Sequence, residues 1–197
     1  KLKVTSLESK LKIQQIICII TLLLVICYLL LTTIRYYQAD LEYAKAETLA
    51  SAGRYDEAVP WIRQALTLRT AEPVYLSEAS SILSSLVAYG FFAPTSDDDA
   101  TKEAADLAIA FSNRALSISP QNVNILKTRA GVFVKLVFTN PQYLEQARES
   151  YEEAARLAPG DAGMLYDLGS FYLHSQNYEK ARLALKQAVT LRPHYRD

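Results

Sequence analysis

The sequence predicts an all-α protein with a single N-terminal transmembrane helix followed by an α-solenoid of about four helix–turn–helix repeats, or eight repeat helices. Three observations predict this architecture. An apolar run near the N-terminus lacks any charged residue, small residues recur at fixed spacing four times, and a proline follows most of the recurring segments. The modest content of seven Pro and six Gly, without a biased tract, argues against wholesale disorder.

The apolar run covers residues 16–34 and reads IICIITLLLVICYLLLTTI. At about 1.5 Å per residue a helix of this length spans roughly 28 Å, close to the hydrocarbon core of a bilayer. We therefore predict a transmembrane helix over 16–34 that contacts the lipid bilayer. A secretory signal and a buried core helix are the alternatives. The signal is disfavoured because the run is long and the first small-x-small triplet, Ala44-Lys45-Ala46, comes late.

The charges that flank the run predict its orientation. The flank over residues 1–15 contains four lysines and one acid, namely Lys1, Lys3, Lys10, Lys12 and Glu8. The segment after the run mixes Arg35 and Lys45 with Asp40 and Glu42. Since cytoplasmic flanks carry the excess of Lys and Arg, we expect the N-terminus in the cytoplasm and the repeat domain outside it.

The repeat pattern is clearest from Ala162 onward, where large apolar, small and proline residues alternate at fixed spacing. Numbered from Ala162, positions 4, 7, 8, 11, 17, 20, 24, 27 and 32 hold Leu165, Leu168, Gly169, Tyr172, Tyr178, Ala181, Leu185, Ala188 and Pro193. Small residues at positions 8, 20 and 27 let two antiparallel helices approach closely, and proline ends the second helix. This segment resembles the tetratricopeptide repeat.

The same marks recur upstream and divide residues 39–197 into four units, at about 39–72, 73–122, 123–161 and 162–195. Position 20 holds Ala58, Ala108, Ala147 and Ala181, and position 27 holds Ala65, Ala115, Ala154 and Ala188. Two residues depart from the family pattern, Glu42 at position 4 of the first unit and Arg129 at position 7 of the third. The second unit carries an insertion, residues 90–99, which its Gly, Pro and Asp residues predict to be a loop.

The resemblance implies a concave groove lined by positions 2, 5, 9, 12 and 13 of the units. The candidate groove residues are Asp40, Tyr43, Glu47, Ser77, Ser81, Ser84, Asn124, Lys127, Tyr166, Ser170 and His174. This set is polar and rich in hydroxyl groups. We therefore expect a protein or peptide partner, or a component of glycan-assembly machinery, in preference to an apolar helix. For His174 the competing interpretation is a surface residue near a helix end.

No catalytic set is recognisable, and we expect no catalytic residue, no cofactor and no metal site. The chain has two His, both cysteines (Cys18 and Cys27) lie inside the apolar run, and the run of Asp97 to Asp99 lacks the spacing of a calcium loop. Without residues 1–34, which contain four Lys and one Glu, 17 basic and 20 acidic residues remain. This net negative charge argues against nucleic acid as a partner.

The features together predict a non-catalytic, membrane-anchored interaction module outside the cytoplasm. The alternative comes from a second resemblance. A span followed by RYYQADLEYAKAETLASAGRYDEAVPWIRQAL is similar to the C-terminal end of bacterial O-antigen ligase and polymerase-family membrane proteins. That resemblance implies an accessory tail of a glycosyltransferase-like enzyme in cell-surface polysaccharide assembly, with the chemistry in upstream spans, so no catalytic residue transfers to this chain. An adaptor that dimerises through its terminal repeat is a third hypothesis.

Overall fold

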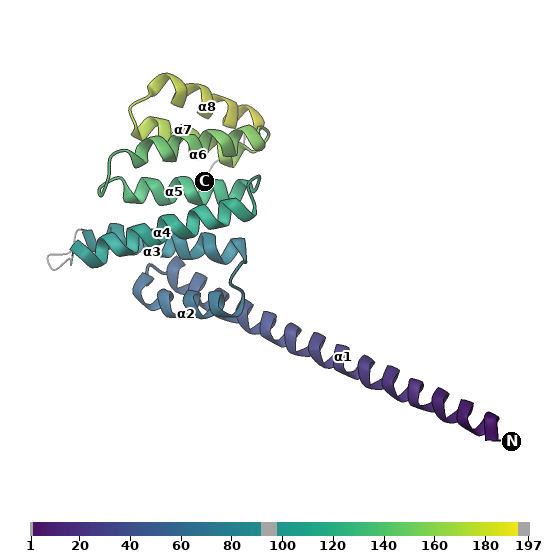
Figure 1. Ribbon diagram of the computed structural model, residues 1–197. Coiled ribbons are helices and arrows are strands. Elements are labelled where there is room, and N and C mark those ends of the chain that lie inside the picture. The colour runs from purple at the N-terminus through teal and green to yellow at the C-terminus, as the bar shows by residue number, and fades with distance from the viewer. Residues whose placement is uncertain (1, 92–97, 193–197) are drawn as a thin grey trace.

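The computed structural model describes residues 2–91 and 98–192, and this part of the chain forms eight α-helices (Figure 1). The helices are α1 (Leu2–Ser51), α2 (Tyr55–Leu68), α3 (Pro73–Phe91), α4 (Asp98–Ile118), α5 (Val123–Leu136), α6 (Tyr143–Leu157), α7 (Ala162–His174) and α8 (Tyr178–Leu191). The prediction of an all-α protein built from helix–turn–helix repeats is confirmed.

The first helix is continuous over 50 residues and contains both the apolar run and the first helix of the repeat domain. It has no internal break because the first Gly and the first Pro of the chain are Gly53 and Pro60. It ends where Gly53 adopts φ +75°, and Arg54 N–H then donates to Leu49 O at 2.9 Å. Figure 1 shows its N-terminal part projecting away from the other helices.

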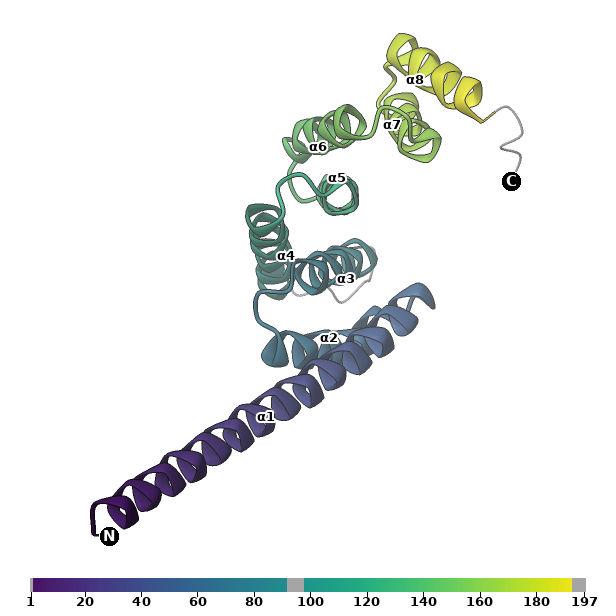
Figure 2. The same cartoon turned by 90° about the vertical axis from the view of Figure 1, so that its right-hand side faces the viewer.

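Consecutive helices pair as α1–α2, α3–α4, α5–α6 and α7–α8, and the pairs stack into a curved solenoid (Figure 2). The C-terminal part of α1 and helices α3, α5 and α7 lie toward the inner side of the curve, whereas α4 and α6 lie on its outer side. Helix α3 also packs on α2 and α5, and this contact joins the first three pairs. The solenoid therefore presents a concave face formed by the first helix of each pair.

Small residues lie at the closest helix contacts, as the repeat pattern predicts. The alanines at positions 20 and 27 are buried in all four units, with exposed fractions from 0% for Ala58 to 6% for Ala188. Gly169 of α7 lies against Leu185 of α8, where an added Cβ would come within 2.6 Å of Leu185 Cγ. Larger side chains at these positions would push the paired helices apart.

The insertion in the second unit is more helical than the sequence analysis predicted. Helix α3 continues through Gly90 to Phe91, and α4 begins at Asp98, so both ends of the expected loop are helix. The acidic residue Asp99 suits the first turn of α4 because negative charge is favourable at the positive end of a helix dipole. Residues 92–97 lie outside the described part of the chain.

The apolar part of α1 stays uncovered by the rest of the molecule. Its large side chains are exposed, from 44% for Ile26 to 68% for Tyr28. In the described residues this is the one helix long and apolar enough to cross a membrane, and none of its apolar stretch is buried within the protein. The run is therefore not a core helix in this structure. Length and composition leave a membrane span and a signal sequence as its two interpretations.

Candidate partner-binding groove

The N-terminal end of the concave face is organised by two stacked tyrosines. Tyr43 of α1 lies over Tyr75 of α3, with ring centroids 4.9 Å apart and an interplanar angle of 15°. The Tyr75 hydroxyl donates a hydrogen bond to Asp40, and Arg69 Nη1 lies 3.4 Å from Asp40 Oδ1. Burial raises the pKa of Tyr43 to about 12, so its hydroxyl remains protonated at neutral pH. Tyr43 and Asp40 thus hold α1 against α3.

The centre of the concave face contains a half-buried lysine surrounded by hydroxyl groups. Lys135 Nζ of α5 donates to Ser85 Oγ at 2.8 Å and to Ser81 Oγ at 3.3 Å, both on α3. Burial lowers the pKa of Lys135, and the negative charge of Glu78 opposes that change. Burial raises the pKa of Glu78, and Glu47 raises it further. The centre of the groove therefore places an amine and a carboxyl group in a partly dehydrated setting.

An ion pair between α5 and α7 occupies the C-terminal end of the concave face. Lys127 Nζ lies 2.5 Å from Asp167 Oδ2. Beside it, Tyr166 is 53% exposed and makes an accessible aromatic surface. His174 is exposed at the end of α7, and its Nδ1 lies 2.7 Å from Ser170 O in the preceding turn. This local contact fits the interpretation of His174 as a surface residue near a helix end.

The structure leaves nine of the eleven candidate groove residues accessible. Asp40, Glu47, Asn124, Lys127, Tyr166 and His174 are exposed, whereas Tyr43, Ser81 and Ser170 are half-buried. Ser77 is 9% exposed and Ser84 is fully buried, so neither can contact a partner as expected. Helix α3 packs against α2, α4 and α5, which covers more of its surface than the repeat register alone indicates.

The sequence analysis missed three half-buried polar residues of the groove, namely Glu78, Lys135 and Asp167, and the buried Ser85 whose hydroxyl contacts Lys135. Ser85 and Lys135 occupy position 13 of their units, the position at which His174 was selected. Applying that position to every unit would have found both residues. Glu78 and Asp167 occupy position 6. No sequence signal pointed to Glu78 and Asp167, because position 6 is not one of the groove positions that the repeat resemblance implies.

The groups along the groove suit the binding of a polar partner. Hydroxyls, amides and an amine can donate hydrogen bonds to the carbonyl and carboxylate oxygens of a peptide, and the tyrosines offer apolar contact. Within residues 2–91 and 98–192, no three His, Cys, Asp or Glu side chains gather as a metal site.

Two segments of the chain match family models described as tetratricopeptide repeat, over residues 144–196 and 39–71. The chain therefore contains tetratricopeptide repeats. This result agrees with the repeat spacing and with the helix pairing described above. The tetratricopeptide fold is typically a non-catalytic scaffold for protein–protein interaction. No curated protein matches the chain.

Solved tetratricopeptide structures resemble most of the chain. "MamA RS-1 ArsTM double mutant" matches with a TM-score of 0.57 and 16% identity over 81% of this chain and 79% of the other. "MamA 41-end from Desulfovibrio magneticus RS-1" matches with a TM-score of 0.55 and 20% identity over 79% of this chain and 76% of the other. "First TPR of Spaghetti (RPAP3) bound to HSP90 peptide SRMEEVD" matches with a TM-score of 0.51 and 18% identity over 71% of this chain and 94% of the other. At these identities the similarity shows the fold.

Proposed function

We propose that the chain is a membrane-anchored interaction module outside the cytoplasm, non-catalytic in itself, whose concave groove binds a peptide segment of a protein partner. The observation that carries this proposal is Lys135. Its amine faces the groove among Ser81 and Ser85, and no carboxylate of the described residues forms an ion pair with it. A peptide carboxylate or carbonyl oxygen would complete its coordination. A related fold bound to the HSP90 peptide SRMEEVD supports peptide binding as the mode.

The geometry of α1 supports the anchor over a cleaved signal. Cleavage after Ala46 would remove Asp40 and Tyr43, which pack on Tyr75 of α3. The first repeat would then lose one of its two helices and expose Tyr75, which is 4% exposed in the intact fold. A membrane helix that continues into the repeat avoids this loss and keeps the module at the bilayer surface, where a raised effective concentration favours weak contacts.

The groove is tested by selecting peptides on the full chain in lipid nanodiscs and measuring their affinity by fluorescence anisotropy. Lys135→Met should weaken the best peptide about tenfold, the loss expected for one charge-assisted contact. Lys186→Met, an exposed lysine of α8, is the matched control and should leave the affinity unchanged. Equal affinity for the two variants would contradict the groove proposal.

The orientation is tested in a background in which Cys18 and Cys27 are replaced by alanine. A cysteine at Ser117 of α4 should react with a membrane-impermeant maleimide in intact cells, and a cysteine at Lys3 should react after lysis only. The reverse pattern would place the repeats in the cytoplasm. If the repeat domain labelled at position 117 were found outside the membrane fraction, the apolar run would be a cleaved signal.

The second candidate is the accessory tail of an O-antigen ligase or polymerase-family enzyme in cell-surface polysaccharide assembly. The span followed directly by Arg35-Tyr36-Tyr37 and the first repeat supports it. None of the similar structures described above is named as a ligase or a polymerase. Several further apolar spans encoded upstream of Lys1 would favour this enzyme, whereas a nearby start codon would favour the single-span module.

A further inference from the structure

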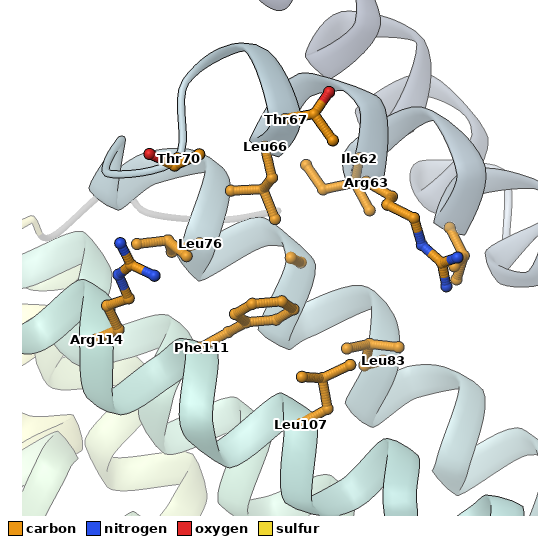
Figure 3. Close-up of a pocket in the computed structure, with 12 residues that line it drawn as sticks. Ile62, Arg63, Leu66, Thr67, Thr70, Leu76, Leu83, Leu107, Phe111 and Arg114 are labelled. Atoms are coloured by element: carbon orange, nitrogen blue, oxygen red, sulfur yellow. The ribbon is translucent and has the colours of Figure 1, made fainter.

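An apolar slot of about 300 Å³ lies between α2 and α4, with α3 as its floor (Figure 3). Leu76, Ala79 and Leu83 of α3 form the floor. Leu66 of α2 and Phe111 of α4 face each other across it. The volume is at the lower end of the range typical of ligand pockets and would hold one large apolar side chain.

The slot is separate from the concave groove. Its floor uses one face of α3, with Leu76 and Leu83, whereas Ser81 and Ser85 on the opposite face contact Lys135 in the groove. At 100° per residue the two sets point in opposite directions from the helix axis. A ligand in the slot therefore leaves the groove free.

Two arginines lie at opposite ends of the slot. Figure 3 shows Arg63 of α2 at one end and Arg114 of α4 at the other, with Leu66 and Phe111 between them. Both arginines are exposed. Within the part of the chain that the structure describes, neither guanidinium forms an ion pair or a hydrogen bond. An apolar centre thus lies between two uncompensated positive charges.

We propose that the slot binds a peptide segment of a partner protein in which a large apolar side chain lies between acidic residues. The apolar side chain enters between α2 and α4, and one carboxylate pairs with each guanidinium. Arginine suits this role because its planar fork binds carboxylates with two parallel hydrogen bonds. A lipid with an acyl chain in the slot would bring its charged group to one end and leave the other arginine uncompensated. The charge at both ends therefore favours a peptide.

The test uses the full chain in lipid nanodiscs and a fluorescein-labelled pentapeptide with Phe at its centre and two Asp on each side. Anisotropy should show binding that weakens as salt is raised, since the rim charges are exposed. The Arg63→Glu/Arg114→Glu double variant should weaken it at least about tenfold. Thr67→Trp, an exposed position on the slot wall, should block the apolar centre and have a comparable effect. Thermal unfolding of each variant verifies that it folds.

The controls separate the slot from general charge effects. Lys186→Glu reverses the charge of an exposed lysine on α8 and should bind the pentapeptide as the unmodified chain does. Pentapeptides with Asn for Asp or Ala for Phe should bind at least about tenfold less tightly. Failure of the parent pentapeptide to bind would overturn the proposal, as would equal binding by the slot variants. Displacement by soluble short-chain phosphatidylglycerol would assign the slot to lipid and also overturn it.

Discussion

Gly169 shows how one missing side chain determines the distance between two helices. A Cβ at this position would lie 2.6 Å from Leu185 Cγ, closer than real contacts allow, and a tight 3.2 Å from Leu185 N. We expect Gly169→Ala to lower the free energy of unfolding by about 1–3 kcal/mol, because overpacking outweighs the gain in helix propensity. Gly131→Ala is the matched control. That Cβ meets no atom within 4 Å, so we expect a gain of about 0.5–1 kcal/mol. Urea denaturation measures both, and a gain for Gly169→Ala would contradict the packing argument.

Glu78 is expected to oppose folding at neutral pH. Burial, with a contribution from Glu47, raises its pKa in the folded protein above the ordinary value of 4.5. A carboxyl with a raised folded pKa favours folding at low pH, and that contribution is lost as the pH rises through the folded pKa. We therefore expect Glu78→Gln to raise the midpoint of thermal unfolding at pH 7. The gain in the unfolding midpoint is reduced because the substitution also removes a negative charge near Lys135. The gain should disappear below pH 4.5, where Glu78 is protonated in both the folded and the unfolded protein.

Glu103→Gln, at an exposed position of α4, is the control for this pH series. It should leave the midpoint nearly unchanged at every pH. A lower midpoint for Glu78→Gln at pH 7 would show that attraction between Glu78 and Lys135 exceeds the dehydration of the carboxylate.

At the scale of elements, Glu152 of α6 contacts both helices of the last pair. Its carboxylate accepts a hydrogen bond from the Tyr172 hydroxyl, and Lys180 Nζ lies 3.2 Å from Oε1. Burial opposes ionisation of Glu152, but the contacts with Tyr172, Arg148 and Lys180 lower its pKa overall. The stabilisation is therefore present above the ordinary Glu pKa of 4.5 and is lost as the pH falls through the folded pKa.

We expect Glu152→Ala to cost about 1–3 kcal/mol at pH 7, because it leaves the hydroxyl of the buried Tyr172 without its partner. Hydrogen exchange should accelerate first in α7 and α8. Glu153→Ala on the same helix removes a solvent-exposed pair with Arg156 and should change the stability much less. Similar losses for the two variants would show that the ion pairs, and not the buried hydroxyl, determine the effect.

The sequence predicted helix pairing well because the constraint is local. Two helices can approach closely only where small residues meet, so Ala58 and Ala65 indicate the contact without knowledge of the rest of the chain. The extent of the groove was harder to predict. Ser84 occupies a groove position by register, yet contacts between α3 and three other helices leave it buried. Burial of this kind depends on the curvature of the stack, which repeat spacing alone does not determine.

At the scale of the whole molecule, the apolar run and the first repeat share one helix. Arg35 Nη2 donates to Thr67 O at 3.3 Å, and the Arg69 guanidinium lies 4.7 Å from the Tyr36 ring centroid. These contacts join the last turn of α2 and the loop that follows it to the turn of α1 directly after the apolar run. If residues 16–34 span the bilayer, helix continuity fixes the direction in which the solenoid leaves the membrane surface.

The same arrangement predicts that the repeat domain folds without the apolar run. Removal of residues 1–34 leaves the contacts of Arg35, Tyr36 and Tyr43 intact, so the free energy of unfolding should change by less than about 1 kcal/mol. The shortened chain should also stay in solution without detergent, because it loses the densest group of exposed apolar side chains. Removal of residues 1–47 is the matched control. It deletes Asp40 and Tyr43, exposes Tyr75 and should unfold the first repeat. Circular dichroism and sedimentation distinguish the two deletions. If both aggregated alike, the apolar run would be part of the fold and not an anchor attached to it.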